Sequence, residues 1–347
     1  MISESNDFIT KVSQTPVLPD NWERLGTIPL NGVLERNQFA PLLTALLGLI
    51  LVFILFQVVI APIAVVFLML IGGTPPHALL DAFVNLVSEQ PKTLLVANTI
   101  GQVLGVALPA LFLARLHSTR RWAFLRMRKV DPRLFIISLV SLVALIPLVQ
   151  WLGQVSDALP WPEFIRAFEK PQLDLIEKVL GQGIGVGPGL LMMALTPALC
   201  EELLFRGYIQ RQAERSLGVV WGIVITGLIF GLFHLRPTQA IPLSVLGIYL
   251  AYITWRTGSL WPAMAVHFAN NGFAVILGAY VKPGSGISLP DIDKMTMPWY
   301  LVVVALGIFV LLIIVMNKEA REIIGALPST ECPGSNESPV SGGPHHG

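Results

Sequence analysis

The sequence predicts an all-α membrane protein, a polytopic helical bundle of about eight transmembrane helices. Of its 347 residues, 54% are apolar and only 13% are charged, and the mean hydropathy is +0.68. Soluble domains have about 25% charged residues, so this composition excludes an ordinary soluble enzyme. The 23 basic and 22 acidic side chains nearly cancel, which leaves no strongly cationic surface for nucleic acid. We therefore expect the lipid bilayer, and not a nucleic acid, as the main partner.

The positions of the spans follow from the lengths of the apolar stretches. A bilayer core about 30 Å thick needs about 20 apolar residues per helix. The first stretch is long enough to be tilted, or broken at Pro62, because proline cannot donate a helical hydrogen bond. The stretches that meet the length test are 41–71, 93–115, 134–152, 188–210, 218–234, 240–256, 259–279 and 299–316.

These spans divide the chain into five parts. Between the third and fourth spans, the loop 153–186 has the pattern of an amphipathic surface helix, which we expect to be interrupted by Pro171. The tail beyond 317 is polar and becomes rich in Pro, Gly and Ser, a composition typical of disorder. The expected parts are a polar amino-terminal segment at 1–38, three spans with the amphipathic outer loop at 39–187, a core of four spans at 188–280, an outer loop and the last span at 281–316, and a disordered tail at 317–347.

The distribution of basic residues predicts the orientation in the membrane. Fifteen Lys and Arg residues fall on the side of the amino terminus and seven on the other side. By the positive-inside rule, both termini are expected in the cytoplasm. Residues 1–38 lack the apolar run of a signal peptide, and nothing suggests an organelle signal. The sequence thus favours a multi-pass protein of a bacterial cytoplasmic (inner) membrane.

Three ionisable residues interrupt the fourth span: Glu201, Glu202 and Arg206. Each costs about 2.5–3.5 kcal/mol at the centre of a spanning helix if it is ionised and unpaired. Glu202 and Arg206 are four residues apart, on one helix face, and should form a buried ion pair. Glu201 is rotated by about 100° from Glu202, so its partner must be water or a group on another span.

Two further spans provide such groups. Phe230 and His234 are one turn apart in the fifth span, and His267 and Asn271 are one turn apart in the seventh. Glycines at 227 and 231 lie on the stripe of His234, and small residues mark close helix contacts in membranes. We therefore expect Glu201, His234, His267 and Asn271 to meet in one buried, water-filled chamber. Pro197 would free a backbone carbonyl nearby and help to open it.

This combination of side chains suits hydrolysis. Glu201 can take a proton from a water molecule held against His234, and that water then attacks a carbonyl carbon. His267 and Asn271 can donate hydrogen bonds to the oxyanion that forms. Alternatively, Glu201, His234 and His267 could hold a zinc ion with water as the fourth ligand. The sequence does not distinguish a glutamate-type from a metalloendopeptidase mechanism.

The same residues resemble the signatures of a known family. Glu-Glu-x-x-x-Arg at 201–206, Phe-x-x-x-His at 230–234 and His-x-x-x-Asn at 267–271, in this order on hydrophobic segments, are similar to those of the CAAX protease and bacteriocin-processing family, also called the Abi or type II CAAX prenyl endopeptidase-like family. The resemblance covers about 188–280. It implies an intramembrane protease that resembles CAAX prenyl protease 2 and cleaves a membrane-associated protein or peptide.

The resemblance also implies a role for each matched residue. Glu201 would be the catalytic carboxylate and His234 its partner in activating water, while His267 and Asn271 would stabilise the oxyanion. Glu202, Arg206 and Phe230 would support them, zinc would be a possible cofactor, and the family's eukaryotic substrate is a prenylated carboxy-terminal peptide.

Other functions are compatible with a buried Glu/His cluster. Each motif alone also fits a structural role, as an ion pair, a buried histidine or an interhelical hydrogen bond. A proton- or cation-coupled carrier could use the same residues as a relay, although the sequence has no internal repeat. A catalytically silent membrane scaffold with the same fold is the third possibility. The intact set of three motifs favours the protease.

Overall fold

The fold is all-α, as predicted. The computed structural model describes residues 28–181, 185–280 and 296–325, and all regular structure within them is helical. Each of the eight predicted apolar stretches coincides with a helix, and only 218–234 and 259–279 extend past the helix ends, by one or two residues. The predicted disordered tail at 317–347 is wrong for residues 317–325, which are helical. The rest of that tail, 326–347, and residues 1–27 of the amino-terminal segment lie outside the described residues.

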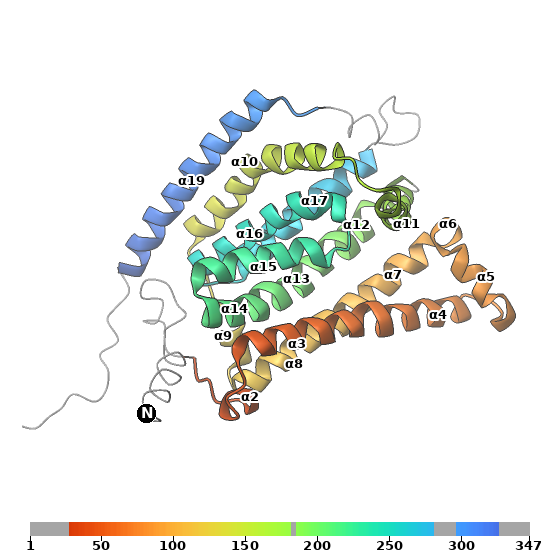
Figure 1. Ribbon diagram of the computed structural model, residues 1–347, viewed down its shortest axis with the longest axis horizontal. Helices are drawn as coiled ribbons and strands as arrows, with labels where there is room; N and C mark the ends of the chain where they lie inside the picture. Colours follow the sequence, from red (N-terminus) through yellow and green to blue (C-terminus); the bar gives the residue numbers. More distant parts are fainter. Residues whose placement is uncertain (1–27, 182–184, 281–295, 326–347) are drawn as a thin grey trace, which may run out of the picture.

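Three of the long helices are continuous rods built from several labelled pieces. Apart from these rods, the helices are shorter connecting elements or single helices. Figure 1 shows the helices of the bundle. In chain order they are α2 (Val33–Arg36), α3–η2–α4 (Pro41–Phe53, Ile54–Ile60, Ala61–Ile71), η3 (Pro76–Ala78), α5 (Leu79–Val84), α6 (Leu86–Glu89), α7–η4–α8 (Pro91–Gly101, Gln102–Ala107, Leu108–His117), α9 (Arg121–Phe124), α10 (Pro132–Asp157), α11 (Glu163–Gly181), α12–η5–α13–η6–α14 (Val186–Gly189, Leu190–Leu195, Thr196–Glu202, Leu203–Ile209, Gln210–Leu217), α15 (Val219–Phe233), η7 (Pro237–Gln239), α16 (Ala240–Thr257), α17 (Trp261–Tyr280) and α19 (Trp299–Gly325).

Five helices in the described parts of the chain are long and apolar enough to cross a membrane. They are Pro41–Ile71, Pro91–His117, Pro132–Asp157, Val186–Leu217 and Trp299–Ile324. At 15 residues α15 is shorter than a full span, and polar side chains such as His267 and Asn271 lower the hydropathy of α17. The membrane-protein class is therefore confirmed, whereas the number of eight spans stays a prediction.

Prolines explain where three of the long helices widen. The segments η2, η4 and η5 are π-helical, and each ends two residues before a proline: Pro62, Pro109 and Pro197. Proline has no N–H and its ring clashes with the carbonyl four residues earlier, so the preceding turn opens to a wider form instead of breaking. The predicted alternative of a helix broken at Pro62 is thus wrong, because Pro41–Ile71 is continuous.

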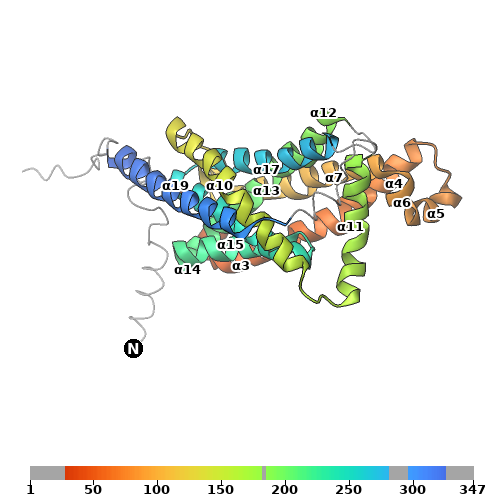
Figure 2. The same cartoon turned by 90° about the horizontal axis from the view of Figure 1, so that it is seen from above.

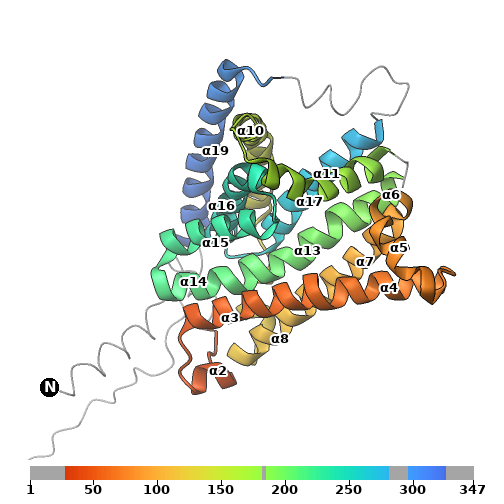
Figure 3. The ribbon, with the colours of Figure 1, turned by 45° about the vertical axis from the view of Figure 1, so that its right-hand side comes forward.

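The helix Val186–Leu217 occupies the middle of the bundle and is the most buried of the five. Figure 3 shows it running between the α3–α4 and α7–α8 rods on one side and α15 and α16 on the other. One apolar cluster, which includes Phe56, Val106 and Phe205, fills the first interface. A second, which includes Leu142 and Tyr249, lies among α10, α16, α17 and α19. The central helix therefore places its polar residues between two apolar layers.

Glycines allow α15 and α16 to pack at close range. A Cβ atom built on Gly247 would lie 2.7 Å from the carbonyl oxygen of Gly227, and one built on Gly231 would lie 2.9 Å from the backbone nitrogen of Ser244. Both distances are shorter than van der Waals contact. The predicted role of Gly227 and Gly231 as a contact stripe is confirmed, and it fixes the position of α15, which ends at His234.

Two expectations about the loops need correction. The helix α11 continues through Pro171 instead of being interrupted there. In Figure 2 it lies across the bundle, outside the parallel rods, where a carbonyl freed by proline can bond to solvent. The last helix extends to Gly325 and not to 316, because Met316, Ala320 and Ile324, spaced one turn apart, are buried against the bundle.

Candidate active site

The central helix presents Glu201 and Glu202 from its buried middle, at 8% and 0% exposure. They lie at the end of α13, directly before the wide turn η6. Because consecutive helical residues are about 100° apart, the two carboxylates face different helices. Their surroundings differ accordingly.

Glu202 forms the ion pair predicted from its spacing. Its Oε1 accepts hydrogen bonds from Arg206 Nη1 at 2.9 Å and from His267 Nδ1 at 2.8 Å. Arg206 and Glu202 are both fully buried. The bond to His267 joins the third motif to the first. His267 thus contacts Glu202, whereas the sequence alone suggested a site centred on Glu201.

Arg206 and Phe230 form the support of this pair. The guanidinium carbon of Arg206 lies 4.2 Å from the centroid of the Phe230 ring, a cation–π distance. Arg206 Nη2 also donates to the carbonyl of Gly247 at 3.0 Å. The Phe230 ring in turn contacts both histidines edge to face, with centroids 4.7 Å from His234 and 5.7 Å from His267. One aromatic ring therefore holds all three motifs together.

Glu201 has a partner that the sequence reasoning missed. Its Oε1 accepts a hydrogen bond of 2.8 Å from Gln102 Nε2, on η4 of the second span. Its Oε2 is buried without a hydrogen-bond partner among the described residues. The signal for Gln102 was present, because it is a polar side chain inside an apolar span, the same criterion that identified Glu201.

His234 faces the free oxygen of Glu201. Its Nε2 lies 3.9 Å from Glu201 Oε2, and its Nδ1 lies 2.8 Å from the carbonyl oxygen of Phe230. Since a carbonyl only accepts, Nδ1 carries the proton. In the neutral ring, Nε2 is then an acceptor directed at the gap beside Glu201. A water molecule about 2.8 Å from each atom fits the geometry of hydrogen bonds.

Asn271 contacts the carbonyl that Pro197 leaves free. Its Nδ2 donates to Met193 O at 3.2 Å, and Met193 is the residue four before Pro197. The expectation that Pro197 frees a carbonyl is confirmed, and that carbonyl is what positions the Asn271 amide. Asn271 also accepts a hydrogen bond from Asn270 Nδ2 at 3.2 Å. It lies one helical turn beyond His267 on α17.

The proposed zinc ligands do not form a set in this structure. Among the described residues, no group of three His, Cys, Asp or Glu side chains is arranged to hold a metal ion. Glu201 and His234 are near one another, but His267 is directed through Nδ1 to Glu202. We therefore derive no catalytic step that uses a metal. Cys200 is a buried free thiol beside Glu201.

The helix α11 is anchored to the turn that follows His234. Glu169 is 2% exposed and its two oxygens accept hydrogen bonds from Thr238 N and Thr238 Oγ1, both at 2.8 Å. Thr238 lies in η7, four residues after His234. The amphipathic helix is thus attached to the site-bearing part of the bundle and is more than a loose connector.

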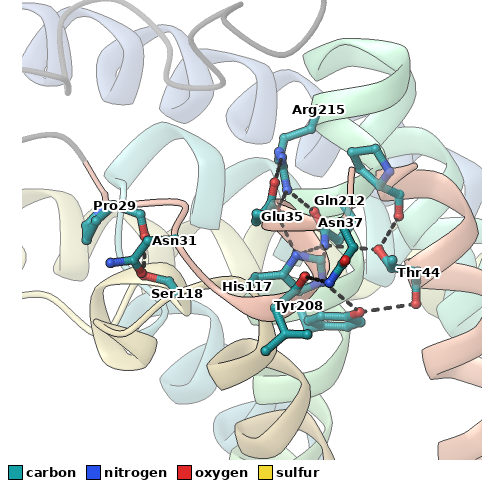
Figure 4. A network of polar contacts seen from close by, with 12 residues as sticks. Pro29, Asn31, Glu35, Asn37, Thr44, His117, Ser118, Tyr208, Gln212 and Arg215 are labelled. Atoms are coloured by element: carbon teal, nitrogen blue, oxygen red, sulfur yellow. Dashed lines mark hydrogen bonds and ion pairs between the residues drawn. The ribbon is translucent and has the colours of Figure 1, made fainter. Parts of the chain in front are cut away.

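A second polar cluster, away from this site, fixes the amino-terminal segment to the bundle (Figure 4). Glu35 on α2 accepts hydrogen bonds from Arg215 at 2.6 and 2.8 Å and lies 2.7 Å from His117 Nδ1. Burial alone would raise the pKa of Glu35, but the hydrogen bonds to His117 and Arg215 outweigh it and lower the pKa to about 2. Gln212 and Tyr208 complete the cluster through bonds to His117.

A protein-family model matches the segment that carries these motifs. Residues 185–273 match the model described as Rce1-like, type II CAAX prenyl endopeptidase Rce1-like. The matched segment begins one residue before the central helix, which starts at Val186, and ends two residues after Asn271, so it contains all three motifs. No curated protein and no solved structure matches the chain. The predicted family resemblance is confirmed for this Rce1-like segment, and it supports an intramembrane endopeptidase that acts on a membrane-associated substrate.

Proposed function

We propose that this chain is a glutamate-type intramembrane endopeptidase in which Glu201 and His234 activate a water molecule. The observation that carries the proposal is the unpartnered, buried Glu201 Oε2, which lies 3.9 Å from His234 Nε2. A buried carboxylate oxygen without a donor is costly, so a site of this kind is expected to hold water. The two acceptors can share the two hydrogens of one water molecule.

The first step in this mechanism is proton transfer from the water to Glu201. The water oxygen attacks the carbonyl carbon of the peptide bond while its proton moves to Glu201 Oε2. The protonated Glu201 then delivers that proton to the amide nitrogen as the tetrahedral intermediate collapses and the C–N bond breaks, which releases the amine and a carboxylic acid product. Gln102 acts as a positioning residue, because its hydrogen bond to Oε1 at 2.8 Å fixes the carboxylate while Oε2 stays free to react.

Stabilisation of the oxyanion falls to α17. His267 Nδ1 is hydrogen-bonded to Glu202, which leaves Nε2 as the nitrogen that can donate to a substrate oxygen. The carboxylate of Glu202 stabilises positive charge on that ring. The Asn271 amide, one turn away, is the second donor.

The substrate class and the topology are part of the proposal. The Rce1-like match and the apolar helices support a membrane-associated protein or peptide as substrate, with a prenylated carboxy-terminal peptide as the first candidate. The excess of basic residues on the side of the amino terminus supports a cytoplasmic membrane protein with both termini inside.

The test uses a matched pair of Glu→Gln substitutions. Glu201→Gln removes the proposed base, whereas Glu322→Gln makes the same change on the exposed face of α19, where the Glu322 side chain is 56% exposed. The purified full-length variants are incubated with a farnesylated and an unmodified peptide of the same sequence, and membrane peptide profiles of cells expressing each variant are compared. We expect cleavage products with wild type and Glu322→Gln and none with Glu201→Gln.

The two assays separate the parts of the proposal. Cleavage of the farnesylated peptide alone identifies a prenylated substrate, and changes confined to the cellular profile identify another membrane peptide. Identical profiles for wild type and Glu201→Gln would contradict proteolysis. Loss of ion or solute flux in that same variant would instead support the carrier.

A further inference from the structure

Three arginines meet in the bundle, away from the proposed active site, near the end of the central helix. Arg126 and Arg128 belong to the loop between α8 and α10, and Arg211 belongs to α14. Arg126 is 1% exposed and Arg211 is 4% exposed. We call these three residues the arginine cluster. A buried guanidinium normally has a carboxylate partner, because an unpaired buried charge is costly.

In the described part of the chain, the carboxylate that contacts the cluster is that of Glu214, and each of its two oxygens already has a partner. Glu214 forms an ion pair with Arg126 through Oε2 and Nη2, and its Oε1 accepts a hydrogen bond from Gln210 Nε2 at 2.7 Å. Glu214 also attracts Arg211 electrostatically, but it accepts no hydrogen bond from Nε or Nη2 of Arg211. Three positive charges against one negative charge leave the cluster with a net charge of about +2.

Several nitrogen donors of the cluster are buried without a hydrogen-bond partner in the described part of the chain. They are Nε and Nη1 of Arg126, Nη1 of Arg128, and Nε and Nη2 of Arg211. Burial and the neighbouring charge of Arg126 lower the pKa of Arg128, in that order of importance. Both observations indicate a missing anion that can accept several hydrogen bonds.

Packing alone does not account for Arg211. Its guanidinium carbon lies 5.2 Å from the centroid of the Phe124 ring, which satisfies one flat face of the group. Guanidinium donors, however, point outward in the plane of the group, toward an acceptor at its edge. The stacked ring cannot accept those hydrogen bonds, so Nε and Nη2 still lack partners.

The backbone holds this loop in one conformation. Arg126 adopts a left-handed conformation with φ of 60°, which is uncommon for a non-glycine residue. Its carbonyl accepts from Leu260 N at 2.9 Å, and the carbonyl of Arg128 accepts from Ser259 Oγ at 2.7 Å. The arginines are thus presented by a fixed loop, which favours a preformed site.

We propose that the arginine cluster binds a phosphate group. Arginine donors match the oxygens of phosphate in fork geometry. A phosphodiester headgroup would offset one of the two excess positive charges, and inorganic phosphate would offset most of both. The group can come from an anionic lipid headgroup or from free phosphate. The lipid source is favoured because the loop joins two membrane-spanning helices and exposes Trp122, 47% accessible, beside Arg121, a composition typical of the membrane interface.

The test compares two Arg→Gln substitutions in the full-length protein. Arg211→Gln removes a cluster charge, and Arg121→Gln removes an exposed charge from the adjoining loop. The thermal unfolding midpoint is measured in uncharged detergent micelles during titration with dioleoylphosphatidylglycerol, with dioleoylphosphatidylcholine, or with inorganic phosphate. We expect a saturable rise for wild type, an apparent Kd at least tenfold weaker for Arg211→Gln, and a change of less than about twofold for Arg121→Gln.

The outcomes distinguish the ligand source from a purely structural role. A rise with inorganic phosphate identifies free phosphate, and a rise with phosphatidylglycerol alone identifies the headgroup. Without ligand, Arg211→Gln should unfold no earlier than wild type, since it removes an unmatched charge. If Arg211→Gln does not fold, Arg128→Gln takes its place. Three outcomes would overturn the proposal. They are no rise of the unfolding midpoint for wild type, a rise in the cluster variant as large as in wild type, and a rise with phosphatidylcholine equal to that with phosphatidylglycerol and also present in the variant.

Discussion

Glu201 and Glu202 are adjacent, and the structure predicts opposite consequences when each is changed to glutamine. Glu202 Oε1 accepts from Arg206 and His267 at 2.9 and 2.8 Å, and Arg206 is fully buried. Glutamine keeps an oxygen there but removes the charge that balances Arg206. Leaving a buried charge without its partner costs about 3–5 kcal/mol. Glu202→Gln should therefore lower the free energy of unfolding by about that amount.

Glu201→Gln should leave stability nearly unchanged. Within the described residues Glu201 accepts a hydrogen bond from Gln102, and its second oxygen has no hydrogen-bond partner, so a neutral amide of the same shape costs about 1 kcal/mol or less. The two variants should thus differ by about 2–5 kcal/mol in stability. Glu201→Gln, the more stable of the two, should nevertheless be the one without any peptidase activity.

The measurement is reversible unfolding in mixed micelles of each purified variant, followed by the fluorescence of the chain's 8 tryptophans, together with the peptide assay on the same samples. Wild type and Glu322→Gln define the range for an unperturbed bundle. If Glu201→Gln is destabilised as much as Glu202→Gln, then Glu201 also balances Arg206. The assignment of one glutamate to chemistry and the other to support would then be wrong.

Three further predictions concern other parts of the bundle. Gln102→Leu should lower kcat about tenfold, because the loss of one hydrogen bond is worth about 1.4 kcal/mol in the barrier; unchanged kcat at equal expression would exclude a positioning role. Gly231→Leu should destabilise the α15–α16 contact by about 1–3 kcal/mol through overpacking, measured by unfolding, with Gly307→Leu as control because nothing lies within 4 Å of a Cβ built there. The stabilising effect of Glu35 should be full above about pH 4.5 and should be lost as the pH falls through about 2, since its pKa is lowered in the folded state; a pH-independent difference in unfolding midpoint between wild type and Glu35→Gln would contradict this.

The parts of the site that the sequence predicts are those fixed within one helix. Glu202 and Arg206 are four residues apart, so helical geometry alone brings them together, and Pro197 frees the Met193 carbonyl through its own covalent structure. The apolar stretches likewise predict the helix positions. The ends are less predictable, since α19 continues to Gly325 through a polar segment of which one face, at Ala320 and Ile324, is buried, and hydropathy does not detect that face.

Contacts between helices could not be predicted in the same way. The bonds of Glu201 to Gln102 and of Glu202 to His267 depend on the rotation of three helices about their axes. A rotation of about 100° exchanges the faces of two neighbouring residues, and the sequence contains no measure of that angle. For the same reason the arginine cluster was not apparent, because 85 positions separate Arg126 from Arg211 in the chain.

The hydrogen bond between Asn271 and Met193 O has a consequence for what can enter the site. In this state the amide and the carbonyl satisfy each other across the gap between α17 and the central helix. A substrate that binds between these two groups must replace the hydrogen bond of each, with an acceptor for the Asn271 amide and a donor for Met193 O. A backbone peptide unit carries one of each, whereas an acyl chain or an isoprenoid carries neither. Pro197 frees the Met193 carbonyl, so an extended polypeptide can separate α17 from the central helix while it satisfies both Asn271 and Met193 O. A hydrocarbon chain would leave both groups without a hydrogen bond.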